Sequence, residues 1–250
     1  MNSLKAILTP AEFRALHTRD LRETACVVFD VLRATSSIAV ALANGAAGVV
    51  PVSEISEALV WRRRQQGILL AGERGGVRIG GELTGGAGFD LGNSPREFTR
   101  EVVRGKTIVT TTTNGTRALR SCAGAKVVLA CSFLNLSATA GFLRQLAPEH
   151  LLLVCSGTGE DEALEDTLCA GALAAEFAAD VACFSAAAVR ALGLWRQHAD
   201  DLAAAMELSA NARRLLGMAE LRDDVAFCLR RDVFNLVAAM SHDGIIQKIA

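Results

Sequence analysis

The stretch Cys26-Val27-Val28-Phe29-Asp30-Val31-Leu32-Arg33-Ala34-Thr35-Ser36-Ser37 decides the fold class. Residues 26–30 predict a buried β-strand, because four apolar or β-branched residues precede a single carboxylate. Hydroxyl-bearing residues then lead into an alanine-rich segment that predicts a helix through Ala43. A buried strand that passes directly into a helix is the building unit of parallel sheets, so this stretch predicts an α/β fold.

The same pattern recurs along the chain. Further strands are predicted at 48–52, 68–71, 107–111, 126–130 and 151–155, and further helices at 53–66, 116–121, 135–146 and 164–179. Alternating strands and helices favour a three-layer α/β/α fold with a mostly parallel sheet. Residues 186–240 predict a helical C-terminal region. The chain is interpreted as a single domain over 1–250, with two subdomains at about 1–100 and 101–250 as the alternative.

One segment departs from this pattern. Residues 72–95 are rich in glycine and predict a long loop, a feature that is usually functional or mobile in a compact domain.

Two other segments resemble each other. Residues 34–50 are similar to residues 112–128, since both run from a strand end through a short helix to a Val-Val strand. This likeness indicates either an internal repeat or the ordinary similarity of strand–helix–strand units.

Composition narrows the function classes. Of the 250 residues 51% are hydrophobic and 21% charged, with a net charge of −1, so a large core is expected and disorder is excluded. The charge balance gives no reason to expect binding to nucleic acid or a membrane. The seven cysteines form no C-x-x-C pair and mostly lie in apolar runs, which is typical of a reducing cytoplasm. A homo-oligomer is compatible with the sequence, which is silent on oligomeric state.

Four polar segments follow predicted strands, where α/β sheets bind their ligands. Each pairs groups suited to an anion or a metal ion: Asp30 with Arg33, Glu73 with Arg74, Asn93 with Ser94, and the run Thr113-Asn114-Gly115-Thr116. The alternative interpretations are a helix cap for the first, a surface ion pair for the second, a turn for the third and a threonine-rich cap for the fourth. Taken together, the segments favour one anion site.

An acidic segment, Glu160-Asp161-Glu162 with Glu165-Asp166, follows the strand at 151–155. Carboxylates in this position suit Mg²⁺, which binds one or two of them together with water and substrate phosphate. Acidic residues also stabilise helix N-termini, which is the alternative interpretation.

Five ordered motifs and a sixth C-terminal block resemble the 2-phosphosulfolactate phosphatase family. They are Asp30-Val31-Leu32-Arg33-Ala34-Thr35-Ser36, Gly72-Glu73-Arg74-Gly75, Gly88-Phe89-Asp90-Leu91-Gly92-Asn93-Ser94-Pro95, Thr110-Thr111-Thr112-Thr113-Asn114-Gly115-Thr116, Leu164-Glu165-Asp166-Thr167-Leu168-Cys169-Ala170-Gly171 and Asp223-Asp224-Val225-Ala226-Phe227-Cys228. The resemblance implies a phosphoric monoester hydrolase that uses Mg²⁺ to convert (2R)-2-phospho-3-sulfolactate into sulfolactate and phosphate. In some archaea this step belongs to coenzyme M biosynthesis.

The motifs, together with the resemblance, predict roles for these residues. The expected catalytic residues are Asp30, Arg33, Glu73 and Asn114, and the expected metal ligands are Asp30, Glu73 and Asp166. Asp30 is alternatively a nucleophile or a general base. The expected substrate-binding residues are Arg33, Arg74, Asn93, Ser94, Thr113, Asn114, Gly115 and Thr116. Two segments differ from the family pattern: the loop at 76–89 is longer than expected, and residues 209–214 lack the expected Ser-x-His-Gly-like segment.

Two other functions remain open from the sequence. One is a phosphatase for a different small phosphorylated 2-hydroxy acid, since a carboxylate and a sulfonate would use the same arginines. The other is a non-catalytic anion-binding protein. The carboxylates Asp30, Glu73 and Asp166 disfavour the second, because they would repel an anion unless a cation lay between them.

Overall fold

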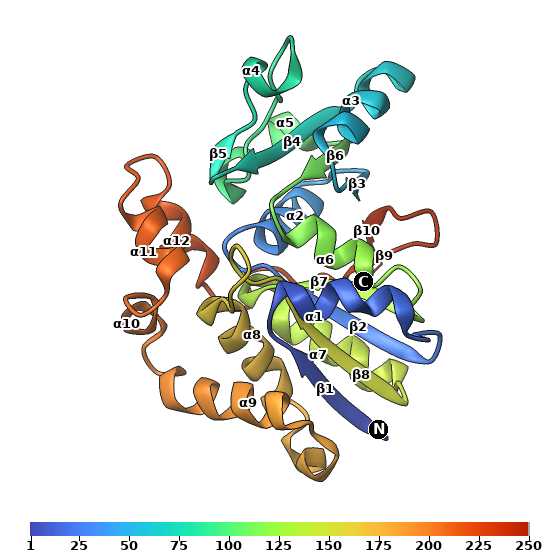
Figure 1. Ribbon diagram of the computed structural model, residues 1–250, viewed down its shortest axis with the longest axis vertical. Helices are drawn as coiled ribbons and strands as arrows, with labels where there is room; N and C mark the ends of the chain where they lie inside the picture. The colour runs from blue at the N-terminus through green and yellow to red at the C-terminus, as the bar shows by residue number, and fades with distance from the viewer. Residues whose placement is uncertain (250) are drawn as a thin grey trace.

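The computed structural model describes residues 1–249, whose strands form one sheet in the order β1-β8-β2-β7-β9-β10-β3-β6-β4-β5 (Figure 1). The strands are β1 (Ser3–Ile7), β2 (Thr24–Phe29), β3 (Gly48–Pro51), β4 (Leu69–Arg74), β5 (Val77–Arg78), β6 (Thr107–Thr111), β7 (Val127–Cys131), β8 (His150–Cys155), β9 (Ala238–Met240) and β10 (Ile246–Lys248). Within these residues, every helix is too short or too polar to cross a lipid bilayer.

The sheet contains two parallel groups of strands. β1, β8, β2 and β7 form the first group, and β3, β6 and β4 form the second. The hairpin β9–β10 joins them by antiparallel pairs on both sides, so the two groups run in opposite directions. The sequence did not predict β1, β9 or β10. The hairpin strands are three residues each, too short for a periodic pattern.

Helices cover both faces of the first group, as expected for three layers. The helices are α1 (Pro10–Arg14), α2 (Ala34–Ala43), α3 (Ile55–Arg64), α4 (Gly81–Thr84), α5 (Arg100–Val103), α6 (Gly115–Ser121), α7 (Leu136–Leu146), α8 (Leu164–Ala175), α9 (Ala186–His198), α10 (Leu202–Met206), α11 (Ala210–Leu216) and α12 (Arg222–Cys228). Alternation along β2 sends Val27 into the core under α7 and α8, and Val28 into the core under α2 and α6. The predicted three-layer fold is confirmed.

Two crossovers connect the groups. The chain leaves β2 through α2 to enter β3, and it leaves β6 through α6 to enter β7. Both helices therefore lie between the two parts of the molecule in Figure 1. These are the two segments whose sequences are alike, and they make equivalent connections in the fold.

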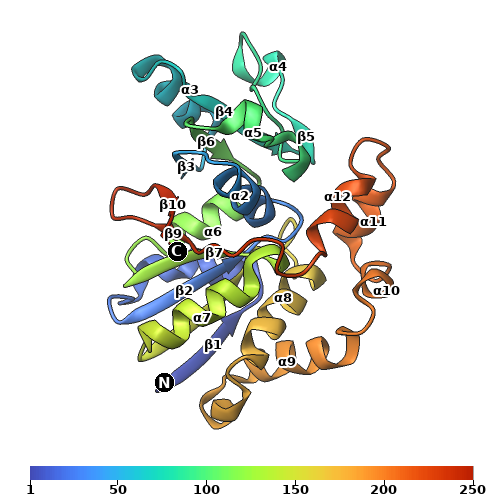
Figure 2. The same ribbon diagram turned by 180° about the vertical axis from the view of Figure 1, so that it is seen from behind.

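The helical C-terminal region forms an arm along one side of the molecule, from α9 to α12 (Figure 2). The prediction of helix through Met240 is wrong beyond α12, because the chain becomes extended after Cys228 and returns to the sheet as β9. The helix predicted at 53–66 is α3. Its N-cap is Glu54, whose N–H donates to the Glu57 carboxylate.

The glycine-rich segment is more ordered than predicted. Strand β4 continues through Glu73 and Arg74, and a turn at Gly75 and Gly76 leads into β5. Both glycines have positive φ, 61° and 83°, which is the left-handed region that favours glycine. The turn brings its backbone to the cavity described next.

Candidate functional site

A cavity of about 220 Å³ lies where the carboxyl ends of strands from both groups meet. The chain after β2 and β8 forms one side, and the ends of β4 and β6 form the other. Helix α11 closes it. The lining residues are Asp30, Leu32, Arg33, Glu73, Gly75, Gly76, Asn93, Thr112, Thr113, Asn114, Ser156, Gly157, Thr158, Gly159, Glu165, Asp166, Asn211 and Arg214. The expected convergence of strand ends is therefore present, although the two groups run in opposite directions.

Asp30 lies at the start of the crossover through α2. Its Oδ1 accepts a hydrogen bond of 2.9 Å from the Ala34 N–H, and its backbone is held by the Thr35 hydroxyl. Burial raises the pKa of the Asp30 carboxyl to about 6; repulsion by Glu73 adds to this effect, whereas the Ala34 hydrogen bond opposes it. Asp30 thus carries a costly charge at neutral pH, which a nearby cation would stabilise.

Gly115 begins α6 directly against the Asp30 carboxylate. A Cβ at this position would lie 2.3 Å from Asp30 Oδ2 and 2.8 Å from the Ala34 Cβ. Gly115 does not line the cavity, so its visible contribution is to let the two crossovers approach closely. The sequence assigned Gly115 to substrate binding, but it did not reveal this contact.

Gly115→Ala is expected to displace the Asp30 carboxylate and lower kcat/KM by about tenfold or more, since misplacing a catalytic group by about 1 Å can cost about a hundredfold. Gly124→Ala is the matched control, because nothing lies within 4 Å of a Cβ there. Steady-state kinetics of both variants checks this. Equal activities would show that the Asp30 carboxylate tolerates the methyl group.

Asp166 joins the ends of β2 and β8. Its Oδ1 accepts from the Val31 N–H at 2.8 Å, and its Oδ2 accepts from the Ser156 hydroxyl at 3.0 Å and the Gly157 N–H at 3.1 Å. Burial, with repulsion by Asp30 and Glu165, raises the pKa of the Asp166 carboxyl well above its usual range. The N-cap of α8 is Ala163, so Asp166 fixes the cavity wall and does not cap the helix.

Glu73 lies across the cavity from Asp30 and Asp166, and three hydrogen-bond donors hold its carboxylate. Its Oε2 accepts from the Gly76 N–H at 2.7 Å, and its Oε1 accepts from the Thr113 N–H and hydroxyl at 2.8 and 2.9 Å. The contacts link the turn after β4 to the segment after β6. Glu73 is thereby aimed into the cavity from the second group of strands.

Glu165 is a buried lining residue that the predicted site omitted. Its carboxylate accepts from the Ser209 hydroxyl at 2.7 Å and the Asn211 amide at 2.8 Å, and Asn211 also donates to the Leu32 carbonyl. Residues 209–214, to which the sequence assigned no role, therefore complete the cavity. The acidic pair Glu165-Asp166 was the available signal, but the partner helix lies more than forty residues farther along the chain.

The donor set fits a cation such as Mg²⁺. Asp30, Glu73, Glu165 and Asp166 line one cavity, and every hydrogen bond described above for them comes from a neutral group. Within residues 1–249, no three or more acidic, histidine or cysteine side chains converge closely enough to hold a metal ion alone. Since Mg²⁺ commonly takes one or two carboxylates plus water and phosphate, these residues fit an ion that a substrate would complete.

Arg33 lies in the lining and is 2% exposed. Its guanidinium donates to the fully buried Asp224 at 2.7 Å and to the Gly76 carbonyl at 2.7 Å. Asp224 also accepts from the Ser94 hydroxyl and from Arg96, at 2.7 and 2.8 Å. Ser94, an expected substrate-binding residue, thus supports Arg33 through Asp224 and is absent from the lining.

The other expected substrate-binding residues divide by position. Asn93, Thr113 and Asn114 line the cavity, but Arg74 and Thr116 do not. Arg74 follows Glu73 in β4 and faces the other way, donating to the Thr111 hydroxyl at 3.1 Å. Thr116 is buried and exchanges hydrogen bonds with Thr112.

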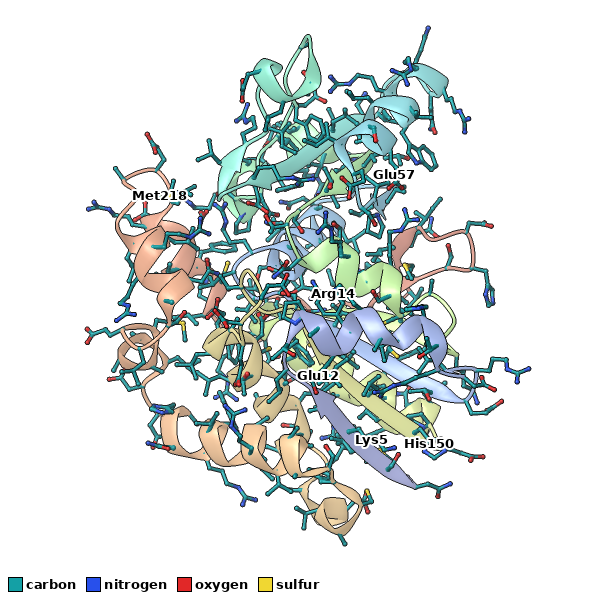
Figure 3. All side chains as sticks on the ribbon, in the orientation of Figure 1. Lys5, Glu12, Arg14, Glu57, His150 and Met218 are labelled. Atoms are coloured by element: carbon teal, nitrogen blue, oxygen red, sulfur yellow. The ribbon has the colours of Figure 1, made fainter. Side chains whose placement is uncertain are left out.

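The loop after β8 is fixed from both sides. The Asn114 amide donates to the carbonyls of Gly157 and Gly159, each at 3.1 Å. Arg14 of α1, labelled in Figure 3, points towards this loop and forms an ion pair with Glu160. Asn114 therefore joins the two groups of strands across the cavity.

The sequence of the chain is similar to one family of known proteins. The family model for 2-phosphosulpholactate phosphatase matches residues 9–243. A relative from Thermotoga petrophila, named probable 2-phosphosulfolactate phosphatase, is 40% identical over 223 residues, which cover 89% of this chain and 91% of the relative. A relative of the same name from Caldanaerobacter subterraneus is 38% identical over 240 residues, covering 94% and 95%. The chain therefore belongs to the 2-phosphosulfolactate phosphatase family, a family of phosphoric monoester hydrolases.

Proposed function

We propose that this protein is a Mg²⁺-dependent phosphatase that hydrolyses (2R)-2-phospho-3-sulfolactate to sulfolactate and phosphate. The observation that carries the proposal is the set of four buried carboxylates and Arg33 around one cavity at the strand ends. Carboxylates without a basic partner would repel a phosphate ester, so their presence favours a site that also takes a cation. The names of the relatives supply the substrate.

Asp30 and Asp166 are the proposed metal ligands, and Glu73, the third ligand expected from the sequence, lines the same cavity from the other group of strands. When bound, Mg²⁺ would neutralise charge on the phosphoryl group and lower the pKa of a bound water. The protein groups fix this arrangement before substrate arrives: Ala34, Val31 and Gly157 N–H groups hold the two aspartates, and Gly76 and Thr113 hold Glu73. Preorganised groups of this kind cost no rearrangement during the reaction.

Arg33 is proposed to orient the phosphoryl group, and Asn114 to position the loop beside it. Arg33 uses two N–H groups on Asp224 and Gly76, which leaves the remaining donors of its fork for substrate oxygens. Asn114 holds the loop that faces the carboxylates. Water attacks the phosphorus atom as its bond to the 2-oxygen breaks, and the leaving alkoxide takes a proton from water.

A substrate panel tests the proposal. The kcat/KM for 2-phosphosulfolactate is expected to exceed the values for phospholactate and phosphoglycolate, all measured with saturating Mg²⁺. A clear preference for an acid without the sulfonate would reject the substrate while keeping the phosphatase. Absence of phosphate release from all three would reject the activity.

Asp166→Asn is expected to raise the Mg²⁺ concentration for half-maximal rate by about 10- to 100-fold, since one charged donor is lost. Both carboxylate oxygens of Asp166 accept from a backbone N–H, that of Val31 or that of Gly157. The asparagine amide nitrogen cannot accept and replaces one of these oxygens, so a loss of stability of about 1–3 kcal/mol is expected. Asp161→Asn is the matched control, because Asp161 is exposed in the same loop and outside the lining. Superimposable Mg²⁺ titrations of Asp166→Asn and the control would remove Asp166 from the metal site.

A further inference from the structure

The cavity lining contains two basic side chains, and they differ in how their charge is compensated. Arg33 is ion-paired with the buried Asp224. Arg214 donates instead to neutral oxygens, the Gly75 carbonyl at 2.8 Å and the Asn211 Oδ1 at 2.9 Å. Within residues 1–249, Arg214 belongs to no ion pair. Arg214 therefore contributes a positive charge to the lining without a direct contact to an acidic side chain.

The fold directs Arg214 towards the cavity. Ser209 caps α11 and also binds Glu165, while Asn211 binds Glu165 and the Leu32 carbonyl. These contacts seat α11 on the cavity wall. Side chains three positions apart share a helix face, so Arg214 lies on the same face as Asn211. Met218, labelled in Figure 3, lies in the arm between α11 and α12.

Arg214 also lies against the turn after β4. A Cβ on Gly76 would be 3.0 Å from the Arg214 Nη1, and the Gly76 carbonyl accepts from Arg33 on its other side. The guanidinium has five N–H donors, of which two are used within the protein, so it can still bind an oxyanion through its fork.

We propose that Arg214 binds the acidic group of the substrate that is not hydrolysed, a sulfonate or carboxylate, and thereby determines specificity for phosphate esters that carry a second acid. This inference rests on the proposed function. Arg33 and the carboxylates serve the phosphoryl end, and Arg214 serves the other end of the molecule. Both acidic groups share the chemistry that a guanidinium fork recognises.

The test compares Arg214→Met with Arg213→Met. Arg213 is exposed, adjacent in sequence and outside the lining, so its substitution removes the same charge without touching the cavity. Arg214→Met is expected to lower kcat/KM for 2-phosphosulfolactate by about 10- to 100-fold, chiefly through KM, as for loss of a charge-assisted hydrogen bond. Arg213→Met is expected to stay near the wild-type value. Equal kinetics in the two variants would overturn the proposal.

Two substrates distinguish the sources of the anion. If Arg214 binds the sulfonate, Arg214→Met retains wild-type kcat/KM on phospholactate, which has no sulfonate. If Arg214 binds the carboxylate, the kcat/KM of Arg214→Met falls by the same factor for both substrates. Either result supports the proposal and assigns the group.

Calorimetry separates this inference from the proposed activity. Sulfolactate, which has both acids and no phosphate, is expected to bind the wild type and to bind Arg214→Met about 10- to 100-fold more weakly, while inorganic phosphate binds both equally. Wild-type protein that binds sulfolactate but releases no phosphate would disprove the proposed function and leave the inference standing. The inference would be overturned if the wild type failed to bind sulfolactate. It would also be overturned if Arg214→Met lost as much affinity for inorganic phosphate as for sulfolactate.

Discussion

Asp30→Asn is expected to lower kcat/KM by about a thousandfold and, in the presence of chelator, to make the folded protein more stable at pH 7. The amide oxygen keeps the hydrogen bond from the Ala34 N–H, so the local structure is retained. The substitution removes the charge that a cation would require and that burial makes costly. High Mg²⁺ is expected to restore part of the rate if Asp30 is a ligand, and none if it is a nucleophile or base.

The pH dependence of stability follows from the same carboxyl. Its pKa is 3.8 in the unfolded chain and about 6 in the fold. Between these values the folded state binds more protons than the unfolded state, so this group makes stability fall as pH rises from about 4 to about 6. Above that window it lowers the free energy of unfolding by up to about 3 kcal/mol. Denaturant unfolding in chelator should show this fall in the wild type and a smaller one in Asp30→Asn. Identical pH profiles would contradict it.

Arg33→Ala is expected to lower both stability and activity, because it removes one partner of a buried ion pair. Asp224 is fully buried and would keep only Ser94 and Arg96, and breaking such a pair costs about 3–5 kcal/mol. The kcat/KM of the folded fraction is expected to fall by about a hundredfold or more, as when a preorganised donor is lost. Arg33→Lys is expected to lose less, since it keeps the charge but not the fork.

Arg96→Ala is the matched control for Arg33→Ala. Arg96 binds the same carboxylate, but its side chain is 39% exposed and lies outside the cavity lining. It is therefore expected to cost less stability and to leave kcat nearly unchanged. Denaturant unfolding and kinetics on the folded protein check both variants. Normal activity per folded Arg33→Ala molecule would show that Arg33 is purely structural.

Much of the candidate site was predictable because strand–helix junctions place polar residues at strand ends. Asp30 and Asp166 come from two such junctions and Glu73 from the end of strand β4, and all three line the cavity. The sequence predicted Arg74 in the same site as Glu73, because residues 72–95 were interpreted as a loop, in which neighbouring side chains can face the same way. Once β4 continues through both residues, their side chains must alternate, and only Glu73 faces the cavity.

Contacts between distant segments were not predictable from the sequence. Periodicity indicated a helical region over residues 186–240, but nothing in it showed that Asn211 reaches Glu165 or that Arg214 reaches the turn after β4. The opposite directions of the two strand groups depend on the hairpin β9–β10, whose short strands carry no pattern. The sequence also does not show whether a hydroxyl group binds a ligand or another residue of the protein. The Thr116 hydroxyl is hydrogen-bonded to Thr112, and the Ser94 hydroxyl to Asp224.

Phosphate release from (2R)-2-phospho-3-sulfolactate, followed with Mg²⁺ and with EDTA, tests the proposed function most directly. Wild-type protein is expected to release phosphate with Mg²⁺, to lose this activity in EDTA and to regain it when excess Mg²⁺ is added. Full activity in EDTA would contradict the proposed metal site at Asp30 and Asp166. No release under either condition would contradict the assignment of the cavity as a phosphatase active site.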